Sequence, residues 1–206
     1  LIGPRIVGVD PVILDANIEA SGTSGWNGEE FIFDASTSNG NFVTYEWDFG
    51  DGTTTSGETV NHSWADGGLY FVVLTAKDAE ERQSVAFEQV RVNSFVEGES
   101  SVNGGADETV PATINPYIEN VSIYINIIGN SGLPFVQSDI TVTINSPSGT
   151  VFEQDLLLND GETQELIFET NEGEMIGDWE LLLESNDPAS DFNYNYDWYS
   201  YYQNSA

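Results

Sequence analysis

The sequence contains no cysteine, one histidine and only 4 basic residues among 206. Without cysteine, disulfides, thiol catalysis and cysteine-ligated zinc are excluded. Four basic residues are too few to neutralise the phosphates of a nucleic acid, so no nucleic-acid partner is expected. The chain also lacks any run of about 18 apolar residues, so no membrane span is predicted.

Acidic residues dominate instead, with 35 Asp and Glu and a formal net charge of −31. Because aromatic residues make up 12% of the chain, it can bury a core and does not resemble a disordered acidic tail. Such a charge repels itself unless it is screened, which fits a halophilic source, a calcium-rich exterior or a secreted protein that simply stays soluble. We expect weak, diffuse Ca²⁺ binding and no required cofactor.

Short strand patterns fill the sequence and predict an all-β fold. Val121, Ile123, Ile125 and Ile127 alternate with polar residues and would share one strand face. We predict two tandem β-sandwiches, over residues 1–94 and 110–206. The linker at 95–109 is rich in Gly, Ser and acidic residues, with Gly104-Gly105 as its hinge.

The segment Tyr45-Glu46-Trp47-Asp48-Phe49-Gly50-Asp51-Gly52 resembles the hallmark of the PKD (polycystic kidney disease) domain family. Further parts of the family pattern follow in order, at 33–36, 61–64 and 68–78, so the resemblance covers about residues 11–93. It implies an immunoglobulin-like β-sandwich outside the cell, without catalysis of its own. The motif residues that we expect to be structural are Trp47, Asp48, Phe49, Gly50, Asp51, Gly52, His62 and Tyr70.

Two of these features invite a catalytic interpretation. His62 is the sole histidine, and Asp48 and Asp51 lie close together, but we interpret His62 as the family's structural histidine and the two carboxylates as turn formers. Some PKD domains bind calcium through acidic residues in the loop before the hallmark strand. Here that loop, residues 36–41, has no carboxylate, so the sequence identifies no metal ligand.

Two segments of the second half form a recognisable pattern: residues 139–150, which include Ser146-Pro147-Ser148-Gly149-Thr150, and residues 173–181. They resemble the P domain of proprotein convertases, which is a β jelly roll. A jelly roll and an immunoglobulin-like sandwich both remain open here. Trp179, Leu181 and Leu183 share one strand face and are expected in the core.

The C-terminal segment 192–202 is unusually aromatic. One interpretation is a final sandwich strand that buries Phe192, Tyr194, Tyr196 and Trp198, with Tyr199 and Tyr201 on its other face. The alternative is an interaction surface that stacks on sugars or pairs with a neighbouring subunit. Its candidate residues are Tyr194, Tyr196, Trp198, Tyr199 and Tyr201. A sharper hypothesis is that this segment, or the N-terminal strand 2–7, inserts into a neighbour's sandwich.

Candidate N-glycosylation sequons occur at Asn61 and Asn120. No phosphate-binding loop, zinc-protease motif or nucleophile elbow is present, so the chain is not expected to be an enzyme. The first function hypothesis is an extracellular structural or interaction protein, such as a surface-layer, filament or adhesin subunit that contacts itself, other surface proteins or glycans. The alternative is an accessory region of a secreted peptidase or polysaccharide hydrolase, which binds a polysaccharide or protein substrate. A signal peptide directly before Leu1 would favour the first hypothesis, and a catalytic domain would favour the second.

Overall fold

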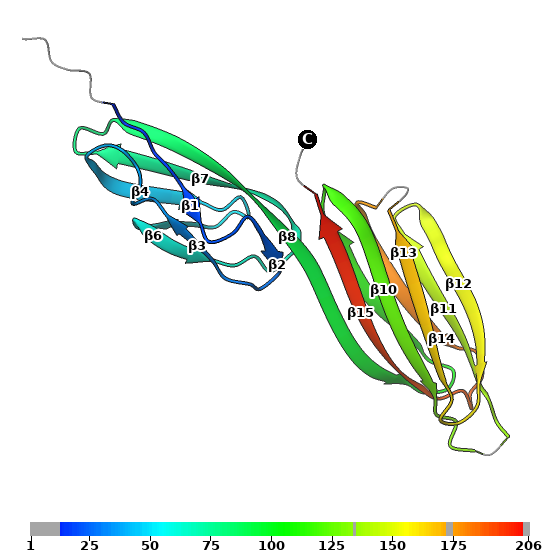
Figure 1. Ribbon diagram of the computed structural model, residues 1–206. Helices are drawn as coiled ribbons and strands as arrows, with labels where there is room; N and C mark the ends of the chain where they lie inside the picture. Colours follow the sequence, from blue (N-terminus) through cyan, green and yellow to red (C-terminus); the bar gives the residue numbers. More distant parts are fainter. Residues whose placement is uncertain (1–12, 134, 172–174, 204–206) are drawn as a thin grey trace, which may run out of the picture. The chain divides into compact units, whose positions relative to one another are not determined.

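The computed structural model describes residues 13–133, 135–171 and 175–203. Every regular secondary-structure element in these ranges is a β-strand, so the predicted all-β class is confirmed. Within them no helix is long and apolar enough to cross a membrane. The chain divides into two compact units (Figure 1). Of the described residues, the first unit comprises 13–23, 30–63 and 70–90, and the second comprises 24–29, 64–69 and those from 91 onward.

The first unit is built from two antiparallel layers. One sheet has the order β1-β3-β6, formed by Glu19–Ala20, Phe31–Asp34 and Thr59–His62. The other has the order β8-β7-β4-β5. Its strands are β4 (Phe42–Asp48), β5 (Thr54–Ser56), β7 (Gly68–Asp78) and β8 (Gln83–Val102), of which residues 70–78 and 83–90 belong to this unit. The predicted N-terminal strand at 2–7 lies outside the described residues.

The core of the first unit is aromatic. Trp47 and Phe49 alternate with exposed Glu46 and Asp48, and both rings are buried, as the period-two pattern predicts. Phe33 from the facing sheet lies with its ring centroid 5.9 Å from that of Trp47 and 5.7 Å from that of Phe49. The predicted core positions of the hallmark are therefore confirmed.

The second unit is a jelly roll. Its two four-stranded antiparallel sheets have the orders β13-β10-β15-β8 and β12-β11-β14-β9, which is the double-sheet pattern of that fold. This topology decides between the two architectures that the sequence left open. A short parallel strand, β2 (Ser24–Trp26), pairs with β8 at residues 91–93. The remaining bounds are β9 (Asp107–Ile114), β10 (Ile118–Gly129), β11 (Ser138–Ser146), β12 (Gly149–Leu158), β13 (Thr163–Thr170), β14 (Gly177–Ser185) and β15 (Phe192–Tyr202).

Branched aliphatic side chains fill the space between the two sheets of the jelly roll. The predicted face of β10, from Val121 to Ile127, is fully buried at its four alternate positions. Trp179, Leu181 and Leu183 on β14 face it and are buried as expected. The P-domain resemblance itself stays a prediction.

The predicted linker was wrong for residues 95–102, which form the second half of β8 and pair with β15. Gly98 illustrates the cause, because it lies directly opposite Tyr196, whose ring occupies the space that a β-carbon at position 98 would need. Glycine weakens a strand because it has no side chain to pack, and here the Tyr196 ring covers Gly98 and supplies the missing packing. The composition of residues 95–102 predicts a loop, but pairing with β15 stabilises them as a strand.

The predicted hinge at Gly104-Gly105 also differs from the structure. Both residues lie inside the second unit, in the turn between β8 and β9. The Gly104 amide donates to a carboxylate oxygen of Asp191 at 2.6 Å, and the Gly105 amide donates to the Ser185 hydroxyl at 3.0 Å. Gly105 has φ +76°, which glycine adopts without strain. The pair therefore forms a fixed turn, held by contacts that local sequence does not reveal.

Insertion of the aromatic C-terminus into a neighbouring sandwich stays a prediction, and the pairing of β15 within its own sheet weighs against it. This strand lies inside its own sheet, with β10 on one side and β8 on the other. Its backbone groups are therefore already engaged in two ladders, and donating the strand to another chain would break both.

Candidate functional site

The two faces of β15 have different roles. Phe192, Tyr194 and Trp198 point into the core and are at most 4% exposed. Their burial removes Tyr194 and Trp198 from the exposed aromatic surface that the sequence predicts. Tyr196 is partly buried against the same core, so it contributes little surface. Tyr199 and Tyr201 lie on the opposite face, as their spacing predicts, and both remain partly exposed.

Five aromatic side chains meet on this outer face of the jelly roll, and together we call them the aromatic face. Its members are Trp26, Phe95, Tyr124, Tyr199 and Tyr201. The ring of Tyr199 stacks on Phe95 with centroids 4.8 Å apart and meets Tyr124 edge-on at 5.9 Å. Trp26 contacts Tyr199 at 6.0 Å and Tyr201 at 5.7 Å, again edge-on. These spacings are those of stabilising aromatic pairs, so the rings support one another.

Backbone pairing positions this set. Tyr199 on β15 lies opposite Phe95 on β8 and opposite Ser122 on β10, which places Tyr124 one diagonal step away. Trp26 ends the parallel strand β2, and the next residue, Asn27, exchanges two hydrogen bonds with the backbone of Phe95. Trp26 and Tyr124 keep 36% and 38% of their surface exposed.

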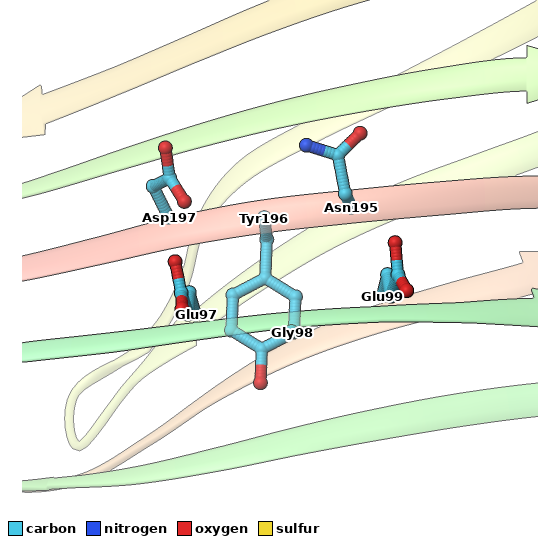
Figure 2. Close-up of a pocket in the computed structure, with 6 residues that line it drawn as sticks. All are labelled: Glu97, Gly98, Glu99, Asn195, Tyr196 and Asp197. Atoms are coloured by element: carbon cyan, nitrogen blue, oxygen red, sulfur yellow. The ribbon is translucent and has the colours of Figure 1, made fainter.

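An acidic hollow adjoins the aromatic face along β8 and β15. Figure 2 shows Glu97 opposite Asp197 and Glu99 opposite Asn195, with the Tyr196 ring lying across Gly98. The hollow has a volume of about 430 Å³. Its carboxylate and amide groups point to the same side of the sheet and offer hydrogen-bond acceptors next to the exposed rings.

A second hollow of about 430 Å³ adjoins the opposite side of the aromatic face. Tyr124 and Tyr201 line it together with Glu119, Asn120 and Glu169. The Tyr124 hydroxyl donates to a Glu169 carboxylate oxygen at 3.2 Å, and this bond is the main reason that the pKa of Tyr124 is raised. Desolvation raises the pKa of Tyr199 as well. Tyr124 and Tyr199 are therefore neutral phenols at physiological pH, and carboxylates flank the aromatic face on two sides.

The PKD hallmark forms a compact structural turn in the first unit. Gly50 and Gly52 have φ +77° and +86°, which explains glycine at both positions. The Asp48 carboxylate accepts the amide of Gly50 at 2.9 Å. Asp51 accepts both the amide and the hydroxyl of Thr53, at 2.9 and 2.6 Å. The turn-forming role predicted for both carboxylates fits this geometry.

His62 packs into the same turn. Its ring stacks on Phe49 with centroids 4.0 Å apart, and its Nε2 lies 2.9 Å from the Asp51 carboxylate. Burial is the largest influence on the pKa of Asp51 and raises it, but the hydrogen bonds from Thr53 and His62 outweigh burial and the pKa is lowered. Tyr70 is partly buried on β7, on the strand that also buries Val72 and Leu74.

The remaining predicted positions are scattered. Asn61 is exposed on β6, and Asn120 lines the second hollow, so glycosylation at either stays a prediction. Among the described residues, no cluster of three or more His, Asp or Glu side chains could hold a metal ion. Weak, diffuse Ca²⁺ binding likewise stays a prediction.

Sequence reasoning missed three members of the aromatic face, namely Trp26, Phe95 and Tyr124. They lie in segments far apart along the chain, and no local pattern links them. The alternation of Tyr199 and Tyr201 was the one available signal, and it indicated that an outward aromatic face exists.

Comparison with known proteins identifies the first part of the chain. Residues 10–92 match the family model of the PKD domain. Collagenase ColA of Bacillus cereus is 33% identical over 73 residues, which are 35% of this chain and 7% of that protein. The chain thus spans 7% of the length of this curated relative.

Solved structures give weaker likenesses. One from a study of carbohydrate-binding modules of the β-sandwich superfamily has a TM-score of 0.37 at 15% identity, covering 89% of this chain and 95% of that one. The CBM51-2 and INT domains of Clostridium perfringens ZmpB give 0.35 at 10% identity, covering 90% and 48%. The T13 particle of IBDV gives 0.40 at 10% identity, covering 77% and 50%. These scores are too low to inform function. The family match, in contrast, confirms that residues 10–92 of this chain are similar to the PKD domain family.

Proposed function

We propose that the chain is a non-catalytic extracellular binding protein whose aromatic face engages a polysaccharide. The observation that carries the proposal is the contact set of Trp26, Phe95, Tyr124, Tyr199 and Tyr201 on one exposed sheet face. Flat apolar ring surfaces complement the C–H faces of sugar rings, while hydroxyl groups need polar partners close by. The two flanking hollows supply such partners.

The charge of the site narrows the ligand class. Glu97, Glu99 and Asp197 line one hollow, and Glu119 and Glu169 line the other. Like charges repel, so an anionic polymer is disfavoured and a neutral or amino-substituted polysaccharide is favoured. The similarity of residues 10–92 to PKD domains and the collagenase relative also support an accessory region of a secreted hydrolase as the setting of such a site.

Sedimentation with insoluble cellulose and chitin tests this proposal. The polysaccharide that the parent chain binds is then tested with a double variant, Tyr199→Ala with Tyr201→Ala. We expect this variant to bind it at least about 10-fold more weakly, because removing aromatic contacts at the centre of an interface typically costs more than about 1 kcal/mol of binding free energy. Phe87→Ala is the matched control, because Phe87 is an aromatic of the first unit that is 70% exposed. Unchanged binding by the double variant would refute the role of the face. If the parent chain binds collagen but neither polysaccharide, and the double variant loses that binding, the ligand of the aromatic face is a protein.

A second candidate function is a self-associating subunit of a surface layer, filament or adhesin in a saline or calcium-rich environment. Two observations favour it: the net charge of −31, and the exposure of apolar residues on edge strands. Leu157 on β12 and Ile167 on β13 are 60% and 61% exposed. Edge strands with exposed apolar residues are sites of lateral pairing.

Light scattering in low salt, in molar salt and with millimolar Ca²⁺ tests self-association. We expect growth into large assemblies when the charge is screened, and a loss of that growth in Ile167→Glu. A monomer under all three conditions would contradict the assembly candidate and leave the polysaccharide site unaffected.

A further inference from the structure

A cleft lies at the side of the jelly roll, where residues 94–96 of β8 approach edge strand β9 of the other sheet. Two cross-strand pairs form its floor, Ser94 with Ser200 and Val96 with Trp198. Residues 111–113 of β9 form one side. We call this space the β8–β9 cleft. Its volume is about 420 Å³, within the range of small-molecule sites. All of its lining residues belong to the second unit.

A buried donor in the floor lacks a partner. Trp198 is 2% exposed, and its indole Nε1–H makes no hydrogen bond within the described part of the chain. A buried donor without a partner is rare in native proteins, so this one needs an explanation. The other tryptophan in the jelly-roll core, Trp179, donates its Nε1–H to the Met175 carbonyl at 2.7 Å. The lack of a partner therefore distinguishes Trp198 from Trp179.

Two hydroxyl groups lie beside this donor. Ser94 and Ser200 are direct cross-strand neighbours, so their side chains point to the same side of the sheet as that of Trp198. Both serines line the cleft. The floor therefore places the unpartnered indole of Trp198 next to two hydroxyl groups, each of which can donate or accept.

The walls of the cleft are held in place by the protein itself. Asn115 donates from Nδ2 to the Gly67 carbonyl at 2.7 Å, and its backbone amide donates to the Tyr202 hydroxyl at 3.2 Å. Gly67 is packed so closely that an added β-carbon would lie 2.6 Å from the Tyr202 ring and 2.7 Å from the Ser94 β-carbon. Because contacts within the protein fix these walls, binding would require little reordering.

The charge and polarity of the lining residues limit the class of ligand that the β8–β9 cleft can bind. Among the lining residues Asp66 is the one with a formal charge, and it is negative, so an anionic ligand is disfavoured. Val96, Pro111 and Ala112 supply an apolar side, while the floor supplies hydrogen bonds. A compact molecule with one apolar face and several hydroxyl groups satisfies both.

We propose that the β8–β9 cleft is a second ligand site, which takes one neutral sugar unit or a polyol of similar size. Trp198 Nε1–H donates to an oxygen of the ligand, and the hydroxyls of Ser94 and Ser200 complete the polar contacts. The site is distinct from the aromatic face, because Trp198 and Ser200 lie on the opposite side of β15 from Tyr199 and Tyr201. It does not depend on the polysaccharide contact proposed above.

Titration with free monosaccharides, followed by ¹H–¹⁵N NMR of the indole groups, tests the proposal. The probes are glucose, galactose, mannose and N-acetylglucosamine, and the chain has five tryptophans, so five indole signals are expected. Trp198→Phe assigns the signal. We expect at least one sugar to shift it saturably, and Ser94→Ala with Ser200→Ala to weaken that binding about 10-fold, which corresponds to about 1.4 kcal/mol.

The serine double variant keeps the tryptophan core, so it separates a binding defect from a folding defect. Tyr199→Ala with Tyr201→Ala is the opposite control and should leave the monosaccharide titration unchanged. An indole signal of Trp198 that no sugar moves at roughly 100 mM would overturn the proposal and leave water as the partner of Nε1. A shift that survives the serine double variant undiminished would overturn it as well. Either result is independent of sedimentation with insoluble polysaccharide, so the two proposals can fail separately.

Discussion

Gly104 and Gly105 are adjacent glycines, yet the structure predicts that a side chain is tolerated at Gly105 and not at Gly104. A β-carbon added at Gly104 would overlap the carbonyl carbon and oxygen of Pro188 and lie 3.0 Å from the Ala189 nitrogen. These are backbone atoms, which cannot rotate away as a side chain would. At Gly105 the nearest atom to an added β-carbon is the Pro188 α-carbon, 4.0 Å away.

The expected cost of Gly104→Ala combines two losses. Overpacking typically costs about 1–3 kcal/mol. Moving the turn to relieve it also weakens the 2.6 Å bond from the Gly104 amide to Asp191, and a hydrogen bond to a charged group contributes about 1.5–3 kcal/mol. We therefore expect the free energy of unfolding of the jelly roll to fall by about 3 kcal/mol or more.

Gly105→Asn is the matched control. Gly105 has φ +76°, a conformation that asparagine adopts more readily than other side-chain-bearing residues, so we expect a cost below about 1 kcal/mol. Urea unfolding followed by tryptophan fluorescence measures both. With a slope of about 2 kcal/mol per molar urea, the midpoint should drop by about 1.5 M for Gly104→Ala and by less than about 0.5 M for Gly105→Asn. Equal, small shifts would show that the pair is a loose hinge, as its sequence indicates, and would refute the packing argument.

Three further predictions concern single side chains. Because the pKa of Asp51 is lowered in the fold, its stabilising contribution is present above the unfolded value of 3.8 and is lost as the pH falls through the folded value; Asp51→Asn should destabilise the first unit by about 1–2 kcal/mol at neutral pH, and thermal melts of variant and parent should converge near pH 3. Burial raises the pKa of Tyr194 to about 12, whereas an unfolded tyrosine ionises near 10, so stability should fall as the pH rises through that interval, and Tyr194→Phe should remove part of that fall in alkaline melts. Trp47→Phe loses the 2.8 Å bond from Nε1 to the Gly57 carbonyl together with ring volume, and urea unfolding should record a loss of about 2–3 kcal/mol.

Local pattern predicted most of the strands. The alternation in residues 121–127 identified the buried face of β10, and the Trp47 to Gly52 motif identified both a core pair and a tight turn. These predictions succeed because period two and turn chemistry are short-range properties of the backbone. The segment at 95–102 failed for the opposite reason, since its strand conformation depends on β15, about 100 residues later in the chain.

The sequence alone determined the all-β class, the PKD-like first part, the acidic character and the outward orientation of Tyr199 and Tyr201, because each depends on composition or on neighbouring residues. Only the tertiary structure decided which residues meet. It buried Tyr194 and Trp198 in the core, brought Trp26, Phe95 and Tyr124 to Tyr199, and enclosed the Trp198 indole beside Ser94 and Ser200. Strand order in a jelly roll joins segments that are distant along the chain, so the site residues become neighbours through long-range pairing that no local pattern encodes.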